Sequence, residues 1–361
     1  MTSERVMSSG YMEWAKLHSK ARFNLATSGI TNYPLSCLPV RLEDLEISGP
    51  SIYGYVPLIE AIAARNSVPA DSVVAATGTS GSNHLAMAAL IEPGDEVLIE
   101  TPTYELIVST ALYLGARVRR FERRFEDDFR LDPEQIERNI SSSTRLIVVT
   151  NLHNPSGAFA DESTMIQIGK IALKVGARVL VDEVYLDAAF DLAPRTSFHL
   201  GAPFIVTSSL TKVYGLSGLR CGWILAPPEI ATRMWRLNDL FGVIPAHLAE
   251  RVSVIALQNL EMITDRTRAI LQPNTALLDQ MFEATPNISF TKNRLGTVAF
   301  PRLDRGDVND LWPFLCQEYE TSVVPGRFFG MPSHFRIGIG GETEMVSEGL
   351  CRLSSAIQAM K

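Results

Sequence analysis

Short β-branched runs alternate with helical patterns between Asp71 and Ala226. Seven runs are candidate strands: residues 72–76, 96–100, 117–121, 145–150, 177–182, 204–208 and 220–226. Three segments between them have the length and apolar spacing of helices: residues 82–91, 104–114 and 162–175. This alternation predicts βα units on a mostly parallel sheet covered by helices.

The pattern changes after Pro227 and Pro228. A long helical stretch covers residues 244–278, and short strands follow among helices at 288–290, 297–300, 322–324 and 335–339. The first 40 residues show no sheet-like alternation, and Pro34 and Pro39 favour an extended arm. The chain is therefore predicted to be α/β, with a large domain of seven mostly parallel strands over residues 46–243. We expect residues 244–361 to form a smaller α+β domain, joined by the arm of residues 1–45.

Length and charge agree with this division and exclude some partners. A chain of 361 residues with 46% hydrophobic residues exceeds the size at which a single core usually stops growing. Nucleic acids and acidic membranes select basic surfaces, whereas this chain has a net charge of -7, so we expect neither partner. The basic cluster from Arg117 to Arg124 is soon followed by Glu126, Asp127 and Asp128, and is predicted to be a solvated face.

Cysteines and histidines suggest neither disulfides nor a metal site. The four cysteines are widely separated and form no C-x-x-C pair, and the six histidines lack the spacing of zinc ligands. The first 20 residues mix charged residues among the apolar ones, unlike the apolar region of a signal peptide. These features predict a cytoplasmic protein without a bound metal.

Polar motifs follow several of the predicted strands. In a parallel sheet, ligands bind beyond the carboxyl ends of the strands. Gly78-Thr79-Ser80-Gly81 follows one strand and opens a helix, whose free N–H groups suit a phosphate, although a glycine turn with a Ser or Thr cap would have the same sequence. Taken alone, Asp182 could cap a helix, Lys212 could be a surface lysine, and His153 could line a pocket or cap a turn.

Taken together, the motifs carry a resemblance. Their order is Gly78-Thr79-Ser80-Gly81, Thr101-Pro102-Thr103-Tyr104, Asn154-Pro155-Ser156-Gly157, Asp182-Glu183-Val184-Tyr185, Ser209-Leu210-Thr211-Lys212 and Gly218-Leu219-Arg220-Cys221-Gly222. This order resembles the class I/II aminotransferases, which are pyridoxal-phosphate (PLP) enzymes of fold type I. The resemblance runs from about Gly54 to Gly340, and it implies a PLP cofactor.

The resemblance also implies roles for residues around the cofactor ring. Lys212 would hold PLP as a Schiff base, the internal aldimine, and then move a proton between the substrate α-carbon and the cofactor. Asp182 would pair with the pyridine nitrogen, which lets the ring accept electrons. Asn154 and Tyr185 would bond the ring 3′-oxygen, and Tyr104 would stack on the ring.

Other positions match the phosphate and substrate sites of the family. The phosphate would lie against Gly78, Thr79, Ser80, Ser209 and Arg220. Arg336 is expected to bind the substrate α-carboxylate in a bidentate fork, with Arg327 as its rival. The backbone of Gly29 would approach the same carboxylate, close to Asn154. Tyr53 directly precedes Gly54, whereas the family's tyrosine, which reaches the partner subunit's phosphate, stands several residues earlier.

The resemblance implies an enzyme that moves the amino group of an amino acid to a 2-oxo acid, as a homodimer with active sites at the subunit interface. A PLP-dependent lyase, decarboxylase or cyclising enzyme would carry the same motifs, because the scaffold binds the cofactor identically in all of these reactions. A non-catalytic PLP-binding regulatory module is a further alternative. That module would need a DNA-binding head, for which the sequence shows no helix-turn-helix pattern.

Overall fold

A seven-stranded sheet forms the centre of the computed structural model, which describes residues 6–50, 52–292 and 294–360. Its strands lie in the order β2-β8-β7-β6-β5-β3-β4. Their bounds are β2 Val73–Thr77, β3 Glu96–Thr101, β4 Arg117–Glu122, β5 Thr144–Thr150, β6 Arg178–Asp182, β7 Phe204–Ser209 and β8 Cys221–Leu225. Only β8 within this sheet runs antiparallel to its neighbours, so the predicted mostly parallel sheet is confirmed.

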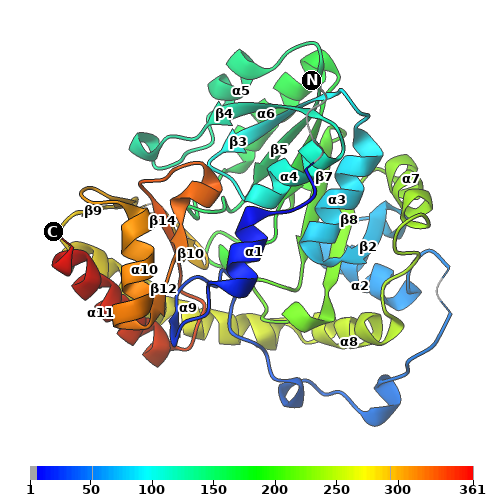
Figure 1. Cartoon of the computed structure of the whole chain (residues 1–361). Helices are drawn as coiled ribbons and strands as arrows, with labels where there is room; N and C mark the ends of the chain where they lie inside the picture. Colours follow the sequence, from blue (N-terminus) through cyan, green and yellow to red (C-terminus); the bar gives the residue numbers. More distant parts are fainter. Residues whose placement is uncertain (1–5, 51, 293, 361) are drawn as a thin grey trace.

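Helices cover the sheet (Figure 1). They are α2 Val56–Asn66, α3 Gly78–Leu90, α4 Glu105–Tyr113, α5 Pro133–Asn139, α6 Glu162–Val175 and α7 Pro228–Asn238. The bounds of α6 agree with the prediction because both ends carry clear signals. The Asp161 side chain accepts a hydrogen bond from the Thr164 N–H, and Gly176 ends the helix in the left-handed conformation. By contrast, α3 begins four residues before its predicted start, directly after β2.

The C-terminal part contains helices around small sheets. Helices α8 His247–Gln258 and α9 Leu260–Ala284 are separate, because Asn259 interrupts the single stretch predicted for residues 244–278. Strand β14 Phe335–Gly338 lies between β10 Val298–Ala299 and β13 Val324–Pro325, and β9 Ile288–Ser289 pairs with β11 Arg302–Leu303. Helices α10 Val308–Tyr319 and α11 Thr343–Ala359 complete this part.

The N-terminal segment is more regular than predicted. It contains helix α1 Gly10–Leu17 and strand β1 Phe23–Asn24, which pairs in parallel with β12 Thr321–Ser322. The Ser9 hydroxyl caps α1 by accepting a hydrogen bond from the Met12 N–H. Figure 1 shows α1 in blue between the large sheet and the orange and red C-terminal elements. The prediction of an extended arm is therefore wrong for residues 10–17, which form a helix.

The basic cluster on β4 is only partly a solvated face. Arg117, Arg119, Arg120 and Arg124 are exposed, but Arg123 is buried and its Nη1 lies 2.9 Å from a buried Glu100 carboxylate oxygen. Arg123 directly follows the last residue of β4, and its Nε also donates to the Phe129 oxygen at 2.7 Å, so its side chain points into the protein. The prediction is wrong for this residue.

Within residues 6–50, 52–292 and 294–360, every helix is too short or too polar to cross a bilayer.

Candidate active site

The polar motifs after the strands meet at one cavity of about 310 Å³. Eight residues singled out from the sequence line it: Thr79, Ser80, Tyr104, Asn154, Asp182, Tyr185, Lys212 and Arg220. A larger cavity of about 760 Å³ lies around Arg65, Asp187 and His199, and none of these eight residues lines it. We therefore place the candidate active site in the smaller cavity, where an amine, a carboxylate and an anion cradle face the same space.

Lys212 stands just beyond the end of β7. Its Nζ donates a hydrogen bond to the Ser28 hydroxyl at 3.2 Å, and its backbone oxygen accepts from the Ile30 N–H at 2.8 Å. A Cβ on Gly29 would lie 3.3 Å from that same backbone oxygen, so the N-terminal segment packs closely on Lys212. Burial lowers the pKa of Lys212, which increases the fraction of neutral, nucleophilic amine.

Asp182 ends β6 as a buried carboxylate. One oxygen accepts from the Asn83 amide at 2.8 Å, and the other accepts from the Val184 N–H at 3.1 Å. The Thr207 hydroxyl donates to the Asn83 carbonyl oxygen at 2.6 Å, which fixes the direction of that amide. Burial raises the pKa of Asp182 to about 6. A carboxylate held in this way can pair with a cationic ring nitrogen placed in the cavity.

The start of α3 forms a cradle for an anion. Gly78 has a left-handed φ of 66°, and a Cβ there would overlap the Arg220 guanidinium. A Cβ on Gly222 would overlap the backbone of Gly78. The Gly78 N–H donates to the Arg220 backbone oxygen at 2.7 Å, and the Thr77 side chain does not cap α3, so among the described residues the next N–H groups of the helix stay available beside the Arg220 guanidinium. The Thr79 hydroxyl donates to the Ser209 hydroxyl at 2.7 Å. Thr79 lines the cavity, whereas Gly78 and Ser209 do not.

Tyr185 and Asn154 also line the cavity. The Tyr185 hydroxyl donates to Ser28 at 2.8 Å, and burial raises its pKa to about 12. Ser28 therefore contacts both Tyr185 and Lys212. The Asn154 side-chain oxygen accepts from Arg336 Nη1 at 3.0 Å. Asn154 thus links the cavity to an arginine that lies behind it.

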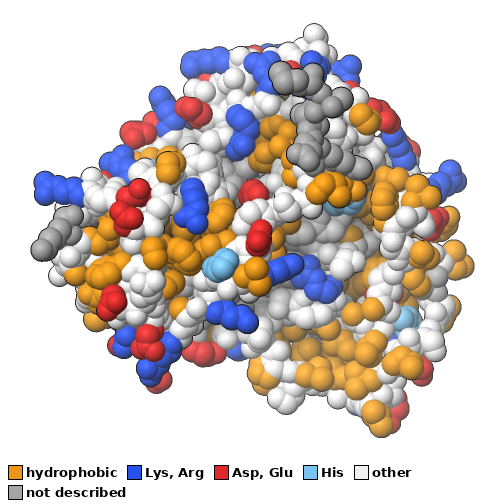
Figure 2. All heavy atoms as spheres, viewed as in Figure 1, with side chains coloured by type: hydrophobic (Ala, Val, Ile, Leu, Met, Phe, Trp, Pro, Cys, Tyr) orange, Lys and Arg blue, Asp and Glu red, His pale blue; other side chains and the backbone are white. Residues whose placement is uncertain are grey.

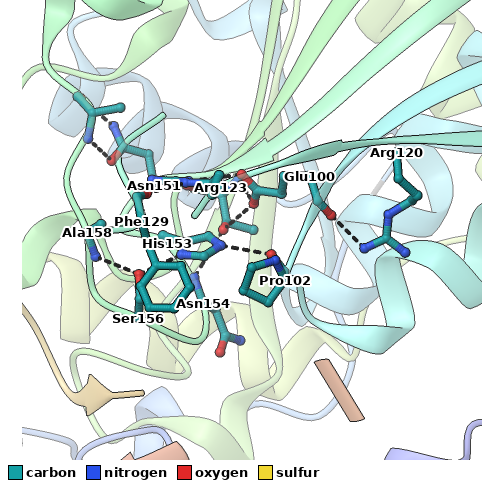
Figure 3. Close-up of polar contacts among 12 residues, drawn as sticks. Glu100, Pro102, Arg120, Arg123, Phe129, Asn151, His153, Asn154, Ser156 and Ala158 are labelled. Carbon is teal, nitrogen blue, oxygen red and sulfur yellow. Dashed lines mark hydrogen bonds and ion pairs between the residues drawn. The ribbon is translucent and has the colours of Figure 1, made fainter. Parts of the chain in front are cut away.

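A buried network of hydrogen bonds holds the segment that carries Asn154 (Figure 3). The Asn154 N–H donates to the Thr150 hydroxyl at 3.1 Å, and Thr150 donates through its own N–H and hydroxyl to Glu100, both at 2.7 Å. Arg123 completes the network on the other Glu100 oxygen.

His153 is also buried, with its ring nitrogens 2.9 Å from the Pro102 oxygen and 2.6 Å from the Ser156 hydroxyl. It neither lines the cavity nor lies at the surface.

Arg336, on β14, is almost fully buried, with 1% of its surface exposed. Its Nη2 donates to the Tyr11 hydroxyl at 3.0 Å and to the Ala26 oxygen at 3.1 Å. Its Nε is buried and has no hydrogen-bond partner among the described residues. Arg327, the rival, is exposed and donates to Asn309 at 2.6 Å. An unpaired buried guanidinium nitrogen beside the cavity fits an anionic ligand group, which favours Arg336.

Tyr53 is the predicted residue that the structure places elsewhere. It is 48% exposed, its ring lies 6.2 Å from that of Trp235, and it does not line the cavity. Three contributors are absent from the sequence-based set: Tyr11, Ser28 and Asn83. Ser28 could have been found, because it directly precedes Gly29. Tyr11 and Asn83 reach the site only through the packing of α1 and α3.

Comparisons with known proteins identify the class. The fold is that of a PLP-dependent transferase of fold type I: a PLP-dependent aminotransferase from Streptococcus suis superposes with a TM-score of 0.93 at 27% identity, over 99% of both chains. The family model for aminotransferase class I and II matches residues 48–353, and the chain belongs to this family. The predicted family, fold class and PLP dependence are confirmed.

Two curated relatives illustrate the range of the family. Capreomycidine synthase from Streptomyces vinaceus is 31% identical over 352 residues, covering 94% of this chain and 90% of the relative. An aspartate aminotransferase from Pyrococcus horikoshii is 24% identical over 302 residues, covering 81% and 77% respectively. The chain is therefore similar over most of its length both to an enzyme named as an aminotransferase and to one named as a synthase.

Proposed function

We propose that the enzyme moves the amino group of an amino acid to a 2-oxo acid, with Lys212 as its central residue. One observation carries the proposal: the Lys212 amine, with its lowered pKa, shares a small cavity with the buried Asp182 carboxylate and the α3 anion cradle. Arg336 lies behind Asn154 at the edge of that cavity. These are the groups that an amino acid and a phosphorylated cofactor require together.

The residues fit PLP. Thr79, Ser80, Ser209 and Arg220, with the backbone at Gly78, would hold the phosphate, and Asp182 would hold the ring nitrogen. Asn154 and Tyr185 would bind the ring oxygen, and Tyr104 would pack on the ring face. When bound, PLP supplies an aldehyde that reacts with amines and a ring that accepts electrons from the substrate α-carbon.

The protein groups would then divide the work. Arg336 orients the substrate through its α-carboxylate, helped by the backbone at Gly29 and by Asn154. The Lys212 amine would move the proton at the substrate α-carbon, since a neutral amine is a competent base. Ser28 holds Lys212 and Tyr185 in place, and Asp182 keeps a proton on the ring nitrogen.

A second reaction has specific support. Capreomycidine synthase has the higher identity of the two curated relatives described above, at 31% against 24%. A lyase, a decarboxylase or a cyclising enzyme would use the same cofactor site, because the fold does not determine the reaction. These reactions would therefore differ in the product that is formed, whereas the cofactor would be bound in the same way.

One incubation separates the two functions. Holoenzyme mixed in equal amount with single amino acids, without any 2-oxo acid, is expected to yield pyridoxamine phosphate and a 2-oxo acid by chromatography. Lys212→Ala is expected to yield neither, whereas Lys170→Ala, an exposed lysine on α6, should behave as wild type. Ammonia, carbon dioxide or a cyclised product with unchanged PLP would instead indicate the second reaction.

We further propose a homodimer with the active sites at its interface. Support comes from the exposed apolar side chains of residues 35–56, which include Leu42 at 82% and Ile52 at 85% exposed. Figure 2 shows apolar side chains gathered at the lower right of the molecule, around this segment and α8. Tyr53 lies in the same region, and we propose that it reaches the partner's cavity.

We also propose the domain division and location expected from the sequence. Residues 46–243 would form the PLP-binding domain, and the N-terminal arm would belong with residues 244–361. The pairing of β1 with β12 supports the second assignment. A cytoplasmic location is proposed because the four cysteines are widely scattered in the sequence.

A further inference from the structure

Helix α1 covers the cavity and is attached on both sides. Tyr11, Met12, Trp14 and Ala15 of this helix line the cavity. On the side of the large sheet, the Glu105 carboxylate accepts from the Ser9 hydroxyl at 2.6 Å and from the Tyr11 N–H at 2.8 Å. On the C-terminal side, the Trp14 ring lies 5.7 Å from Trp312 and 5.4 Å from Phe328. The helix therefore forms one wall of the candidate active site.

Tyr11 stands between Arg336 and the cavity. Its hydroxyl accepts from Arg336 Nη2, and its ring lies 5.5 Å from the Tyr104 ring in an edge-on arrangement. The two hydrogens of Nη2 are taken by Tyr11 and by the Ala26 oxygen, while Nε has no partner among the described residues. A carboxylate that binds Nε and Nη2 together must therefore replace one of these acceptors. The side-chain hydroxyl is more easily replaced than the backbone oxygen.

The wall formed by α1 and the residues after it is uncharged. Residues 11–28 contribute Tyr11, Met12, Trp14, Ala15, Ser19, Ala26, Thr27 and Ser28 to the cavity lining. The charged residues of the lining are Asp182, Lys212 and Arg220, and all three are assigned to the cofactor in the proposed function. Within the described residues, no further charged side chain lines the cavity to meet a charged substrate side chain.

A cationic side chain is disfavoured for a second reason. The Arg336 guanidinium carbon already lies 5.8 Å from the Tyr11 ring and 5.2 Å from the Phe329 ring, close enough to interact with both aromatic faces. A second cation near Tyr11 would be repelled by Arg336, and the one carboxylate among the described lining residues, Asp182, is assigned to the cofactor ring nitrogen. An apolar side chain would instead bury its surface against Tyr11, Met12 and Trp14.

We propose that Tyr11 and the apolar face of α1 receive the substrate side chain, so that the enzyme selects amino acids with uncharged, apolar side chains. In the free enzyme the Tyr11 hydroxyl holds the place of the substrate carboxylate at Arg336. This inference rests on the proposed function, because it assumes that an amino acid binds at Arg336.

Unreactive carboxylates test the inference without any turnover. Isothermal titration calorimetry on the holoenzyme would compare 3-phenylpropanoate with succinate and 5-(trimethylammonio)pentanoate, whose quaternary nitrogen is cationic but cannot form a Schiff base. We expect 3-phenylpropanoate to bind at least about 10-fold more tightly than the other two, as burial of an aromatic ring predicts. Tyr11→Ala should reduce this preference to about threefold or less. Tyr11→Phe should keep the preference and bind every carboxylate about threefold more tightly, because no hydroxyl competes for Arg336.

Controls separate this inference from the proposed function. Tyr319→Phe, outside the cavity lining, should match wild type in all three titrations, and unchanged PLP absorbance would show that each variant keeps its site. Equal or tighter binding of succinate or 5-(trimethylammonio)pentanoate by wild type, absence of binding by all three ligands, or an unchanged preference in Tyr11→Ala would overturn the inference. Absence of pyridoxamine phosphate in the earlier incubation, with the ligand preference intact, would overturn only the proposed reaction.

Discussion

Asp182 shows how a single residue controls the chemistry available to the cavity. Its carboxylate receives two hydrogen bonds yet is buried deeply enough that its pKa rises to about 6. A cationic partner in the cavity would lower that pKa and keep the carboxylate charged. Asp182 is thus prepared for a positively charged ring nitrogen.

The first prediction follows from this arrangement. Asp182→Asn is expected to retain PLP, because size and part of the hydrogen bonding persist, but to lose amino transfer by about 10²–10³-fold in single-turnover measurements. Glu183→Gln, one residue further along and outside the cavity lining, is the matched control and should transfer at nearly the wild-type rate. Near-normal rates in Asp182→Asn would remove Asp182 from the proposed chemistry.

Glu183 gives a prediction about pH and stability. This buried carboxyl accepts from the Ser197 N–H at 2.7 Å, and burial raises its pKa to about 7. Because the folded-state pKa is above the unfolded value, its favourable contribution is complete below about pH 4.5 and is lost as the pH rises through 7. Between pH 5 and 8, wild type should lose roughly 2–3 kcal/mol relative to Glu183→Gln, measured by urea unfolding. A difference that does not change with pH would contradict this assignment.

Among single residues, the sequence predicts those site residues that lie in contiguous motifs. Asn154, Asp182 and Lys212 each follow a strand within a specific local pattern, and they line one cavity in the structure. Tyr11 and Asn83 could not be predicted, because each reaches the cavity through the packing of a helix whose local sequence carries no sign of it. Arg123 illustrates the reverse error, since a basic cluster suggests solvent and one of its members is buried.

At the scale of elements, strands β3, β4 and β5 are joined by a buried ion pair. Arg123, just after β4, donates to Glu100 of β3, and Glu100 accepts from both donors of Thr150 at the end of β5. The next residues carry Asn154 into the cavity. The ion pair therefore positions the segment after β5 as well as holding the sheet.

Removal of one partner should be costly. Arg123→Met is expected to destabilise the protein by about 3–5 kcal/mol, because Glu100 would remain buried without its cation. The double variant Arg123→Met with Glu100→Gln should recover part of that loss, which thermal or urea unfolding would measure. Arg124→Met, at an exposed neighbour, should change stability little. Equal stability of the two arginine variants would contradict the structural role of the pair.

The sequence predicts the elements well where their ends carry chemical signals. The predicted strands of the large sheet agree within about one residue at each end, and in the inner strands β5, β6 and β7 the runs are almost entirely buried. Helix α6 is flanked by Asp161 and Gly176, which mark its two ends. The start of α3 was placed too late because glycines at positions 78 and 81 suggest a turn and not a helix. Helix α1 is short, and its own sequence pattern is weak. Contacts with Glu105 and with aromatic side chains hold it in place.

At the scale of the whole molecule, the exposed apolar surface requires an explanation. Leu42, Ile47 and Ile52 are 82%, 78% and 85% exposed, and Leu240 near α8 is 76% exposed. A group of large apolar side chains in water is unfavourable unless another surface covers it. A second copy of the chain would bury this surface on both subunits.

The dimer prediction can be tested by light scattering. Wild type is expected to have twice the mass of the chain at assay concentration, and Ile47→Asp with Ile52→Asp should shift the molecule toward the monomer with a loss of activity. Leu173→Asp, 57% exposed on α6, is the matched control and should remain dimeric. A fully active wild-type monomer would contradict the proposal.

Mixed subunits test whether Tyr53 serves the partner's site. If the sites are shared, mixing Lys212→Ala subunits with Tyr53→Ala subunits should recover part of the activity, because one of the two hybrid sites would contain both residues. Hybrids as inactive as the parent variants would place Tyr53 outside the site.

The central claim is that Lys212 carries the cofactor in this cavity. Borohydride reduction of the holoenzyme, followed by digestion and mass spectrometry, tests it most directly, because reduction fixes the cofactor to the lysine that holds it. We predict a single pyridoxyl group, on the peptide containing Lys212, with the same result in Lys170→Ala and no labelled peptide in Lys212→Ala. A pyridoxyl group on any other lysine of the wild-type protein, or an unlabelled Lys212, would contradict the claim.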